Sequence, residues 1–136
     1  IRLTVWAALL PLAILIQTAF VAGLGLALSV LNVFYRDVQH LLEVLLLGWF
    51  FLTPIFYPLD ILPRDYNFLG ITLDLWRWMQ ILNPMASIIA IYRDILYWGR
   101  MVGLDFLIRT AVTCFLVFIV GMAVFRRYRF VIAEEV

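Results

Sequence analysis

The segment WFFLTPIFYPLDILP runs from Trp49 to Pro63 and closes an apolar stretch that is otherwise typical of a membrane helix. It holds five aromatic residues and three prolines, and its first acidic residue is Asp60. Pro54 and Pro58 each remove a backbone donor, so the helix is predicted to kink or end inside the outer leaflet. Carbonyl groups freed there require cover from protein or a water-filled cavity. The prolines therefore favour a broken helix along a pathway over the simpler alternative, an aromatic belt at the interface.

The composition indicates an integral membrane protein or a piece of one. The chain has 136 residues, of which 66% are hydrophobic and only 14% charged, whereas soluble domains carry about a quarter charged residues. It begins with Ile1 rather than Met, and we expect a fragment whose start lies upstream. A net charge of +1 gives no argument for a nucleic-acid partner. Cys114 is the one cysteine, so we expect a small apolar packing residue there and no disulfide within the chain.

Charge-free runs predict an all-α integral membrane fold with three transmembrane helices. The runs cover residues 3–35, 44–59 and 110–125. The first exceeds the ~20 residues that a bilayer crossing needs, and the other two are extended at their starts to reach that length. The predicted spans are residues 9–33, 41–58 and 104–125, followed by a tail at 126–136. Pro11 falls in the first turn of the first span, where a missing N–H costs little. Arg126, Arg127 and Arg129 follow the third span directly and predict a cytoplasmic C-terminus.

Residues 60–103 form the segment between the second and third spans, on the outer side in this topology. Its apolar part is too short to cross a bilayer and is typical of interfacial or re-entrant helices. Asn83-Pro84 interrupts it, because a residue before proline avoids the helical region and proline suits a first helical position. We therefore expect two short helices, at 72–82 and 85–97, hinged at Asn83-Pro84. Aromatic rings at headgroup level are expected from Trp76, Trp78, Tyr92, Tyr97 and Trp98.

Two further features concern helix packing and the inner turn. Ala19, Gly23 and Ala27 are four residues apart and predict a face on which another helix packs closely, although glycine is also common in membrane helices. In the inner turn, Asn32 is expected to close the first span and Asp37 to cap the second. Arg36 and Asp37 could pair with each other, with lipid headgroups or with another subunit. The predicted turn comprises Asn32, Tyr35, Arg36 and Asp37.

Catalytic and metal-binding patterns are weak. His40 and Glu43 are three residues apart on the second span, and such a pair at a membrane surface is usually solvated. The chain has one histidine, and it lacks the metalloprotease, nucleophile-elbow and P-loop motifs. We predict no catalytic residue, no metal site and no ATP site on this chain.

The order of four segments resembles a known family. NVFYRDV, PIFYP, LNP and FRRYRF follow one another as in the C-terminal half of the permease of polysaccharide ABC exporters, of the O-antigen, capsule and teichoic-acid type. The resemblance implies a six-span permease of the inner membrane, of which this chain holds the last three spans. It also implies a homodimer, a separate P-loop ATPase that binds ATP and Mg²⁺, and a lipid-linked polysaccharide as substrate.

The resemblance also implies roles for particular residues. The substrate pathway would be lined by Trp49, Phe50, Phe51, Phe56 and Tyr57. The kink and the outer gate would comprise Pro54, Pro58, Asn83, Pro84, Tyr92 and Arg93. The inner turn would lie near the ATPase. Three alternatives stay open: a permease for drugs or small lipids, a membrane scaffold protein, and a polytopic glycosyltransferase with acidic or metal-binding motifs upstream.

Overall fold

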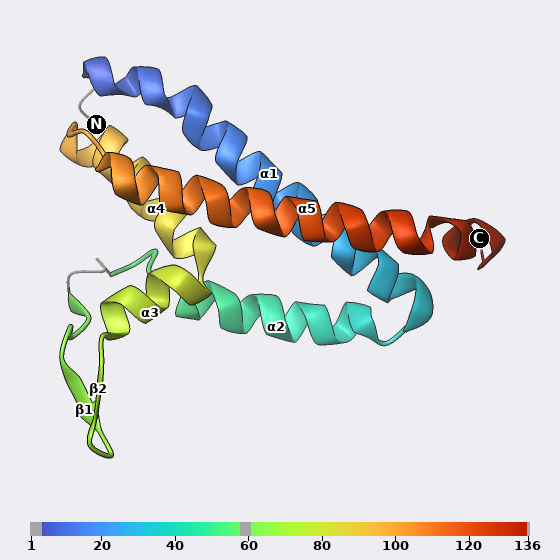
Figure 1. Ribbon diagram of the computed structural model, residues 1–136. Helices are drawn as coiled ribbons and strands as arrows, with labels where there is room; N and C mark the ends of the chain where they lie inside the picture. The colour runs from blue at the N-terminus through green and yellow to red at the C-terminus, as the bar shows by residue number, and fades with distance from the viewer. Residues whose placement is uncertain (1–3, 58–60, 136) are drawn as a thin grey trace.

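The computed structural model describes residues 4–57 and 61–135. Three long helices dominate these residues, and a small hairpin and shorter helices lie between the second and the last of them (Figure 1). The elements in chain order are η1 (Val5–Leu9), α1 (Leu10–Phe34), α2 (Val38–Leu52), β1 (Tyr66–Phe68), β2 (Ile71–Leu73), α3 (Leu75–Leu82), α4 (Pro84–Arg93), η3 (Asp94–Trp98) and α5 (Leu104–Glu135).

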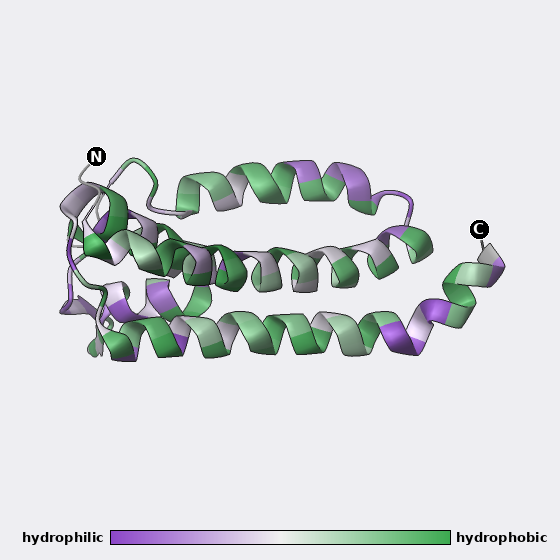
Figure 2. Ribbon diagram, turned by 90° about the horizontal axis from the view of Figure 1, so that it is seen from above, coloured by the Kyte–Doolittle hydropathy of each residue, from purple (hydrophilic) through white to green (hydrophobic). Residues whose placement is uncertain are grey.

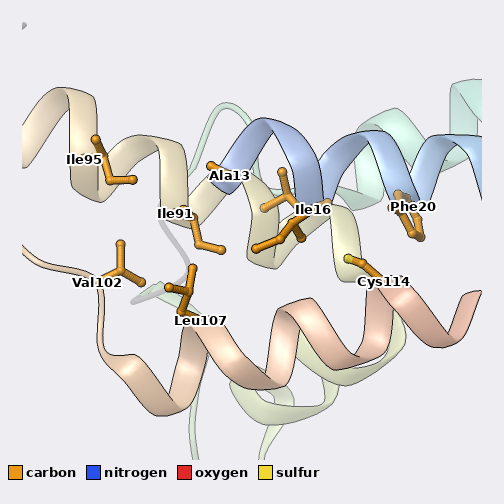
Figure 3. Close-up of a cluster of buried hydrophobic side chains, with 9 residues drawn as sticks. Ala13, Ile16, Phe20, Ile91, Ile95, Val102, Leu107 and Cys114 are labelled. Carbon is orange, nitrogen blue, oxygen red and sulfur yellow. The ribbon is translucent and has the colours of Figure 1, made fainter. Parts of the chain in front are cut away.

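The hydrophobic core lies where α1 and α5 pack against each other and against α4 and η3. Helix α1 contributes Ala13, Ile16 and Phe20, spaced three and four residues apart on one face. Figure 3 shows these side chains pointing toward Leu107 and Cys114 of α5. The remaining members of the cluster are Ile88, Ile91, Ile95 and Val102. Helices α4 and η3 are thus anchored in the same core as the two longest helices.

Helices α1 and α5 come closest at a pair of glycines. A Cβ atom added to Gly121 would overlap with the carbonyl oxygen of Gly23. A Cβ atom added to Gly23 would lie 2.6 Å from the Cα atom of Phe118. Ala19 and Ala27, four residues to either side of Gly23, are half-buried. The two backbones therefore touch at Gly23 and Gly121, with no room for a side chain on either.

Among the described residues, two helices are long and apolar enough to cross a membrane: Val5–Phe34, with 30 residues, and Leu104–Glu134, with 31. Helix α2 is shorter, with 15 residues. Within the expected span at 41–58, helix α2 stops at Leu52 and Thr53 is extended (φ −79°, ψ 128°), as the predicted break at the prolines requires. The cause is Pro54, which lacks an N–H and disfavours helical geometry in the residue before it. Pro58 lies outside the described residues.

The last helix is longer than predicted. Helix α5 begins at Leu104, as expected, but continues through the supposed tail to Glu135. No glycine or proline follows Gly121 in this helix, so nothing in the sequence interrupts it. Pro11 lies in the first turn of α1, also as expected. The predicted end of the span at residue 125 is the point where apolar residues give way to basic ones, and helix α5 continues beyond it.

The segment between α2 and α5 contains a β-hairpin that the sequence does not predict. Strands β1 and β2 are antiparallel, with Phe68 opposite Ile71. The turn residues Leu69 and Gly70 have φ angles of 52° and 81°, and leucine rarely occupies that position. The first short helix therefore begins at Leu75 instead of residue 72, with the Asp74 side chain accepting from the Arg77 amide at 3.1 Å. Helix α4 continues as η3 to Trp98, where Gly99 (φ 60°) ends it.

The two ends of the bundle differ. One end carries the turn between α1 and α2 at residues 35–37, and we call it the turn end. Here the Phe34 and Tyr128 rings lie 5.5 Å apart, which places this turn beside the basic part of α5. At the hairpin end lie β1, β2, α3 and η3 (Figure 1). Figure 2 shows the hydrophilic residues gathered toward these two ends, with apolar helix between them. This distribution is the one expected of helices that cross an apolar layer.

Candidate functional site

The end of α2 is joined to the start of α4 by a buried group of hydrogen bonds, which we call the Asn83 junction (Trp49, Thr53 and Asn83). Trp49 Nε1 donates to Asn83 Oδ1 at 3.1 Å. Asn83 Nδ2 donates to Thr53 Oγ1 at 3.0 Å, and Thr53 Oγ1 donates to the Trp49 carbonyl at 2.8 Å. Asn83 and Thr53 are only 3% and 2% exposed. A predicted pathway residue, Trp49, is thus tied directly to the predicted hinge.

Asn83 also begins helix α4. Its side-chain oxygen accepts a hydrogen bond from the Ala86 amide at 3.4 Å, and Pro84 occupies the first helical position. An asparagine cap followed by proline is a strong helix start, because the cap satisfies an amide that has no partner within the helix. The interruption expected at Asn83-Pro84 is therefore present, between α3 and α4. One side chain both starts the helix and holds the end of α2.

The residues that follow α2, which we call the post-α2 segment (residues 53–57), are not helical, and Arg93 covers their carbonyl groups. Arg93 Nη2 donates to the carbonyl oxygens of Pro54 and Ile55, each at 3.1 Å. Arg93 Nη1 donates to the Tyr57 carbonyl at 3.5 Å. Guanidinium presents several N–H groups in a fixed fork, which suits several acceptors at once. The carbonyls freed by the break in α2 thus find their donors on the last residue of α4.

The residues beside Arg93 bind elsewhere. Asp94 accepts from Arg100 through Nε at 2.8 Å and Nη2 at 2.7 Å. The Arg100 side chain is 63% exposed, so this is a surface pair. On the other side, the Tyr92 hydroxyl donates to Gln17 Oε1 of α1 at 2.7 Å. The end of α4 is therefore attached to the post-α2 segment through Arg93 and to α1 through Tyr92.

The predicted pathway aromatics separate into two groups. Trp49 is held in the Asn83 junction, and the Tyr57 hydroxyl donates to the Leu52 carbonyl at 3.3 Å. The other three form a cluster in which the Phe50 ring lies edge-on to Phe51 at 5.6 Å and to Phe56 at 5.7 Å. Phe51 is 67% exposed and Phe56 is 80% exposed. The phenylalanines present open ring surface, whereas Trp49 and Tyr57 are engaged in hydrogen bonds to their own fold.

A cleft of about 900 Å³, which we call the hairpin-end cleft, opens beside the post-α2 segment. Its walls come from this segment, α3, α4, η3 and the start of α5. The aromatic members are Phe56, Tyr57, Trp76, Tyr97, Trp98 and Phe106, and the polar ones are Gln80, Arg93, Asp94 and Arg100. The sequence interpretation assigned Trp76, Tyr97 and Trp98 to the headgroup level. No spacing in the sequence indicates that they share one cleft with Phe56, since that depends on how the segments fold back.

The turn between α1 and α2 is exposed and differs in detail from the prediction. Helix α1 continues past Asn32 to Phe34, so Asn32 does not close it. Asp37 lies at the N-cap position of α2, but its side chain makes no capping hydrogen bond. Arg36 and Asp37, which both belong to the described part of the chain, are exposed and form no ion pair with each other. The polar groups of this turn are directed to solvent, where a partner or lipid headgroups could reach them.

His40 and Glu43 lie on the exposed surface of α2 near the same turn. Within residues 4–57 and 61–135, the structure brings together no group of three or more histidine, cysteine or acidic side chains. Metal sites usually need three or four such ligands. The described residues thus assemble no candidate metal centre.

Two long apolar helices, beside a third that ends just before a proline, are typical of an α-helical membrane protein. Residues 1–97 match the model of a family described as ABC-2 type transporter. The chain belongs to the ABC-2 type transporter family. The class of membrane component expected from NVFYRDV, PIFYP and LNP is therefore confirmed at the level of the family.

Two curated relatives have a more specific name than the family model. A protein of Myxococcus xanthus named O-antigen export system permease protein RfbA is 32% identical over 128 residues, which are 94% of this chain and 46% of that protein. A Klebsiella pneumoniae protein of the same name is 27% identical over 125 residues, 92% of this chain and 44% of the relative. The chain spans about half the length of the curated relatives it matches. The predicted resemblance to polysaccharide export permeases is confirmed by these matches.

Proposed function

We propose that this chain is part of the transmembrane subunit of an ATP-driven exporter, which moves a lipid-linked polysaccharide across the cytoplasmic membrane. Family membership supports the transporter class, and the relatives' name supports a glycan of the O-antigen type. The observation that carries the proposal is the broken α2, with exposed phenylalanines beside it and Arg93 covering its freed carbonyls. Irregular backbone at membrane depth is typical of transport pathways and not of lipid anchors.

In this proposal the chain crosses the membrane three times. A helix of 15 residues is ~22 Å long, which is shorter than the ~30 Å hydrocarbon core. The post-α2 segment completes the crossing of α2, since Arg93 satisfies the carbonyls that lipid could not. Helices α1 and α5 are the other two spans. Helices α3 and α4 with η3 are the re-entrant outer gate, on the side opposite the turn end.

The turn end faces the cytoplasm in this arrangement. Arg126, Arg127 and Arg129 lie within α5 at that end, next to the turn at residues 35–37. Basic residues beside a membrane helix favour the cytoplasmic side. The exposed turn is then the part of this chain nearest a separate P-loop ATPase, which would bind ATP and Mg²⁺. The full-length permease would form the pathway as a homodimer.

The chain would bind and gate, with no covalent chemistry. Aromatic faces stack on the C–H faces of sugar rings and tolerate different sugars, which suits a polymer in motion. A helix transmits displacement along its length, so movement of the turn by an ATPase would shift the far end of α2. That end is joined to the outer gate by the Asn83 junction and by Arg93. ATP-driven movement inside the cell would thereby reach the gate outside.

The test begins with affinity capture of the full-length parent protein from gently solubilised membranes. A stoichiometric P-loop ATPase is expected to co-purify. A preparation without any ATPase, in a detergent that preserves transporters of this kind, would contradict the exporter and favour a scaffold protein.

Deletion of the gene then tests the substrate. Lipid-linked polymer should accumulate inside the cell while surface polysaccharide falls, and the full-length gene should restore both. Unchanged surface polysaccharide together with raised sensitivity to drugs would overturn glycan export in favour of a drug permease.

A further inference from the structure

We infer that a small polar pocket around Arg109 binds the phosphate headgroup of a membrane phospholipid. This Arg109 pocket lies between α3, α4 and α5, and its polar walls are Gln80, Ser87, Arg109, Thr110 and Thr113. It shares Gln80 with the hairpin-end cleft and has no aromatic residue in its lining. The inference rests on α5 crossing the membrane and does not depend on the exported cargo.

Arg109 is a charged residue of a membrane helix without a carboxylate partner among the described residues. It lies five residues after Leu104, the start of α5, which is about 7.5 Å along the helix. Asp105, one turn earlier, forms no ion pair with it, and the ion pair within the described part of the chain joins Arg100 and Asp94. Charged side chains in membrane helices are costly and usually mark a functional site. The charge of Arg109 therefore indicates an anion from outside these residues.

One hydrogen bond orients the Arg109 guanidinium. Its Nη2 donates to Gln80 Oε1 at 2.6 Å, and Gln80 is only 6% exposed. A guanidinium has five N–H groups in a planar fork, and this is the one hydrogen bond that it makes to the described residues. The rest of the fork is available for a phosphate, whose oxygens can accept two parallel hydrogen bonds from arginine. Arg109 itself is exposed, so a ligand can reach it.

The size and the hydroxyl groups of the pocket fit a glycerol phosphate headgroup. Its volume of about 250 Å³ is below the range of about 300–1,000 Å³ that is usual for drug-sized ligands, which suits a headgroup better than a length of polysaccharide. The Thr110 and Thr113 hydroxyls donate to backbone carbonyls at 2.8 Å and 2.9 Å, so their oxygens remain as acceptors. The hydroxyls of a glycerol headgroup would donate to these oxygens while its phosphate accepts from Arg109. Phosphatidylglycerol has both groups.

An exposed apolar stripe leads from the pocket toward the middle of α5. Leu116 and Val120 lie seven and eleven residues after Arg109, which places them on the same face of the helix. Their exposed fractions are 56% and 59%. A basic polar pocket followed by apolar surface matches the order of headgroup and acyl chain in a phospholipid, and basic pockets between membrane helices are known lipid sites. A free phosphate ion would leave the stripe uncovered.

The experiment measures phosphatidylglycerol binding to the full-length permease, purified in a neutral detergent with any subunit that co-purifies. Native mass spectrometry counts the bound lipids and gives their affinity. Arg109→Gln removes the charge, whereas Thr113→Leu fills the pocket and keeps Arg109. The matched controls are Arg77→Gln, an exposed arginine of α3, and Val112→Leu, at a 53% exposed position of α5; neither residue lines the pocket. Thermal denaturation without added lipid checks that each variant is folded.

We expect one tightly bound lipid per permease copy in the wild type. Arg109→Gln should weaken its binding at least about tenfold, the scale of a lost hydrogen bond to a charged group. Thr113→Leu should weaken it as much, because the leucine occupies the space of the headgroup, and both controls should bind as the wild type does. Equal losses in Arg109→Gln and Arg77→Gln, or wild-type affinity in Thr113→Leu, would refute the pocket in favour of general attraction to surface charge. If Arg109→Gln does not fold, Thr113→Leu decides.

Two further measurements identify the source of the phosphate. Inorganic phosphate at the same concentration should not displace phosphatidylglycerol, and displacement would overturn the lipid site in favour of a phosphate ion. Lipid extracted from the protein purified from its own cells should be phospholipid, and it should be depleted in Arg109→Gln. A lipid-linked saccharide in its place would assign the pocket to an exported substrate and overturn the phospholipid. Failure of the proposed function, seen as surface polysaccharide that persists when the gene is deleted, would leave these binding results unchanged.

Discussion

Trp49 and Asn83 are separated by 34 residues in the chain and are joined by a hydrogen bond of 3.1 Å from the indole Nε1 to the side-chain oxygen. The bond connects the last turn of α2 with the break between α3 and α4. Asn83 is buried and also caps α4, so one side-chain amide makes hydrogen bonds to the end of α2 and to the start of α4. Displacement of α2 relative to the hinge would have to break this bond or carry the hinge with it.

The first prediction concerns Asn83→Ala. The change leaves the buried Thr53 hydroxyl, the buried Ala86 amide and the partly buried Trp49 indole N–H without this partner. Each buried group left unpaired costs about 1–3 kcal/mol, so the midpoint of thermal denaturation of the purified full-length protein should fall by several degrees. Asn67→Ala, on the exposed strand β1, is the matched control and should leave it unchanged. Identical midpoints for the two variants would show that the junction contributes nothing to stability.

The second prediction separates the aromatic residues that present open surface from those engaged in hydrogen bonds. Phe56→Ala should lower the amount of surface polysaccharide several-fold and leave thermal stability nearly unchanged, because its ring is 80% exposed. Trp49→Ala should lower both, since it also removes a donor from the Asn83 junction. Val44→Ala, a 71% exposed apolar residue of α2, serves as the control for a truncated surface side chain. Normal export by Phe56→Ala would argue against a pathway along this ring.

The third prediction concerns Arg93→Lys. Lysine keeps the positive charge but cannot donate to three carbonyl groups in a fixed fork. Backbone amides in and around residues 53–57 should then exchange faster with deuterium, measured by mass spectrometry on the full-length protein in nanodiscs. Arg77→Lys on α3 is the control, because the hydrogen bond from Arg77 to the Asp74 side chain comes from the Arg77 backbone amide and survives the change. Equal exchange in Arg93→Lys and wild type would mean that Arg93 does not hold the post-α2 segment.

The sequence was sufficient for the elements whose signals are local. Charge-free runs located α1, most of α2 and the apolar part of α5. Asn83-Pro84 located the break between the short helices, because capping and proline geometry act over a few residues. Pro54 indicated a kink or an end, and the structure shows that α2 ends before it, at Leu52. The hairpin was missed because Leu69 occupies a turn position that asparagine or glycine would usually mark.

Contacts between distant segments were beyond the reach of sequence patterns. Periodicity indicated that Gly23 faces a neighbouring helix, but nothing in it selects Gly121, 98 positions later, as the residue it meets. Proline chemistry predicted that freed carbonyls need donors, yet Arg93 is identified as the donor only by the folded chain. The hairpin-end cleft could not be predicted for the same reason, since Phe56, Trp76 and Trp98 come together from three separate segments.

The last prediction concerns the contact between α1 and α5. Gly121→Ala places a methyl group where the Gly23 carbonyl oxygen lies, so the two helices must move apart along their shared core. Backbone cannot yield as a flexible side chain does, and overpacking of this kind costs about 1–3 kcal/mol. Gly25→Ala is the matched control on α1, because nothing lies within 4 Å of the added atom and alanine is the better helix former by about 0.5–1 kcal/mol. Thermal denaturation of the full-length protein should show Gly121→Ala below wild type and Gly25→Ala at or above it. The opposite order would mean that α1 and α5 do not touch at Gly23 and Gly121 in the membrane.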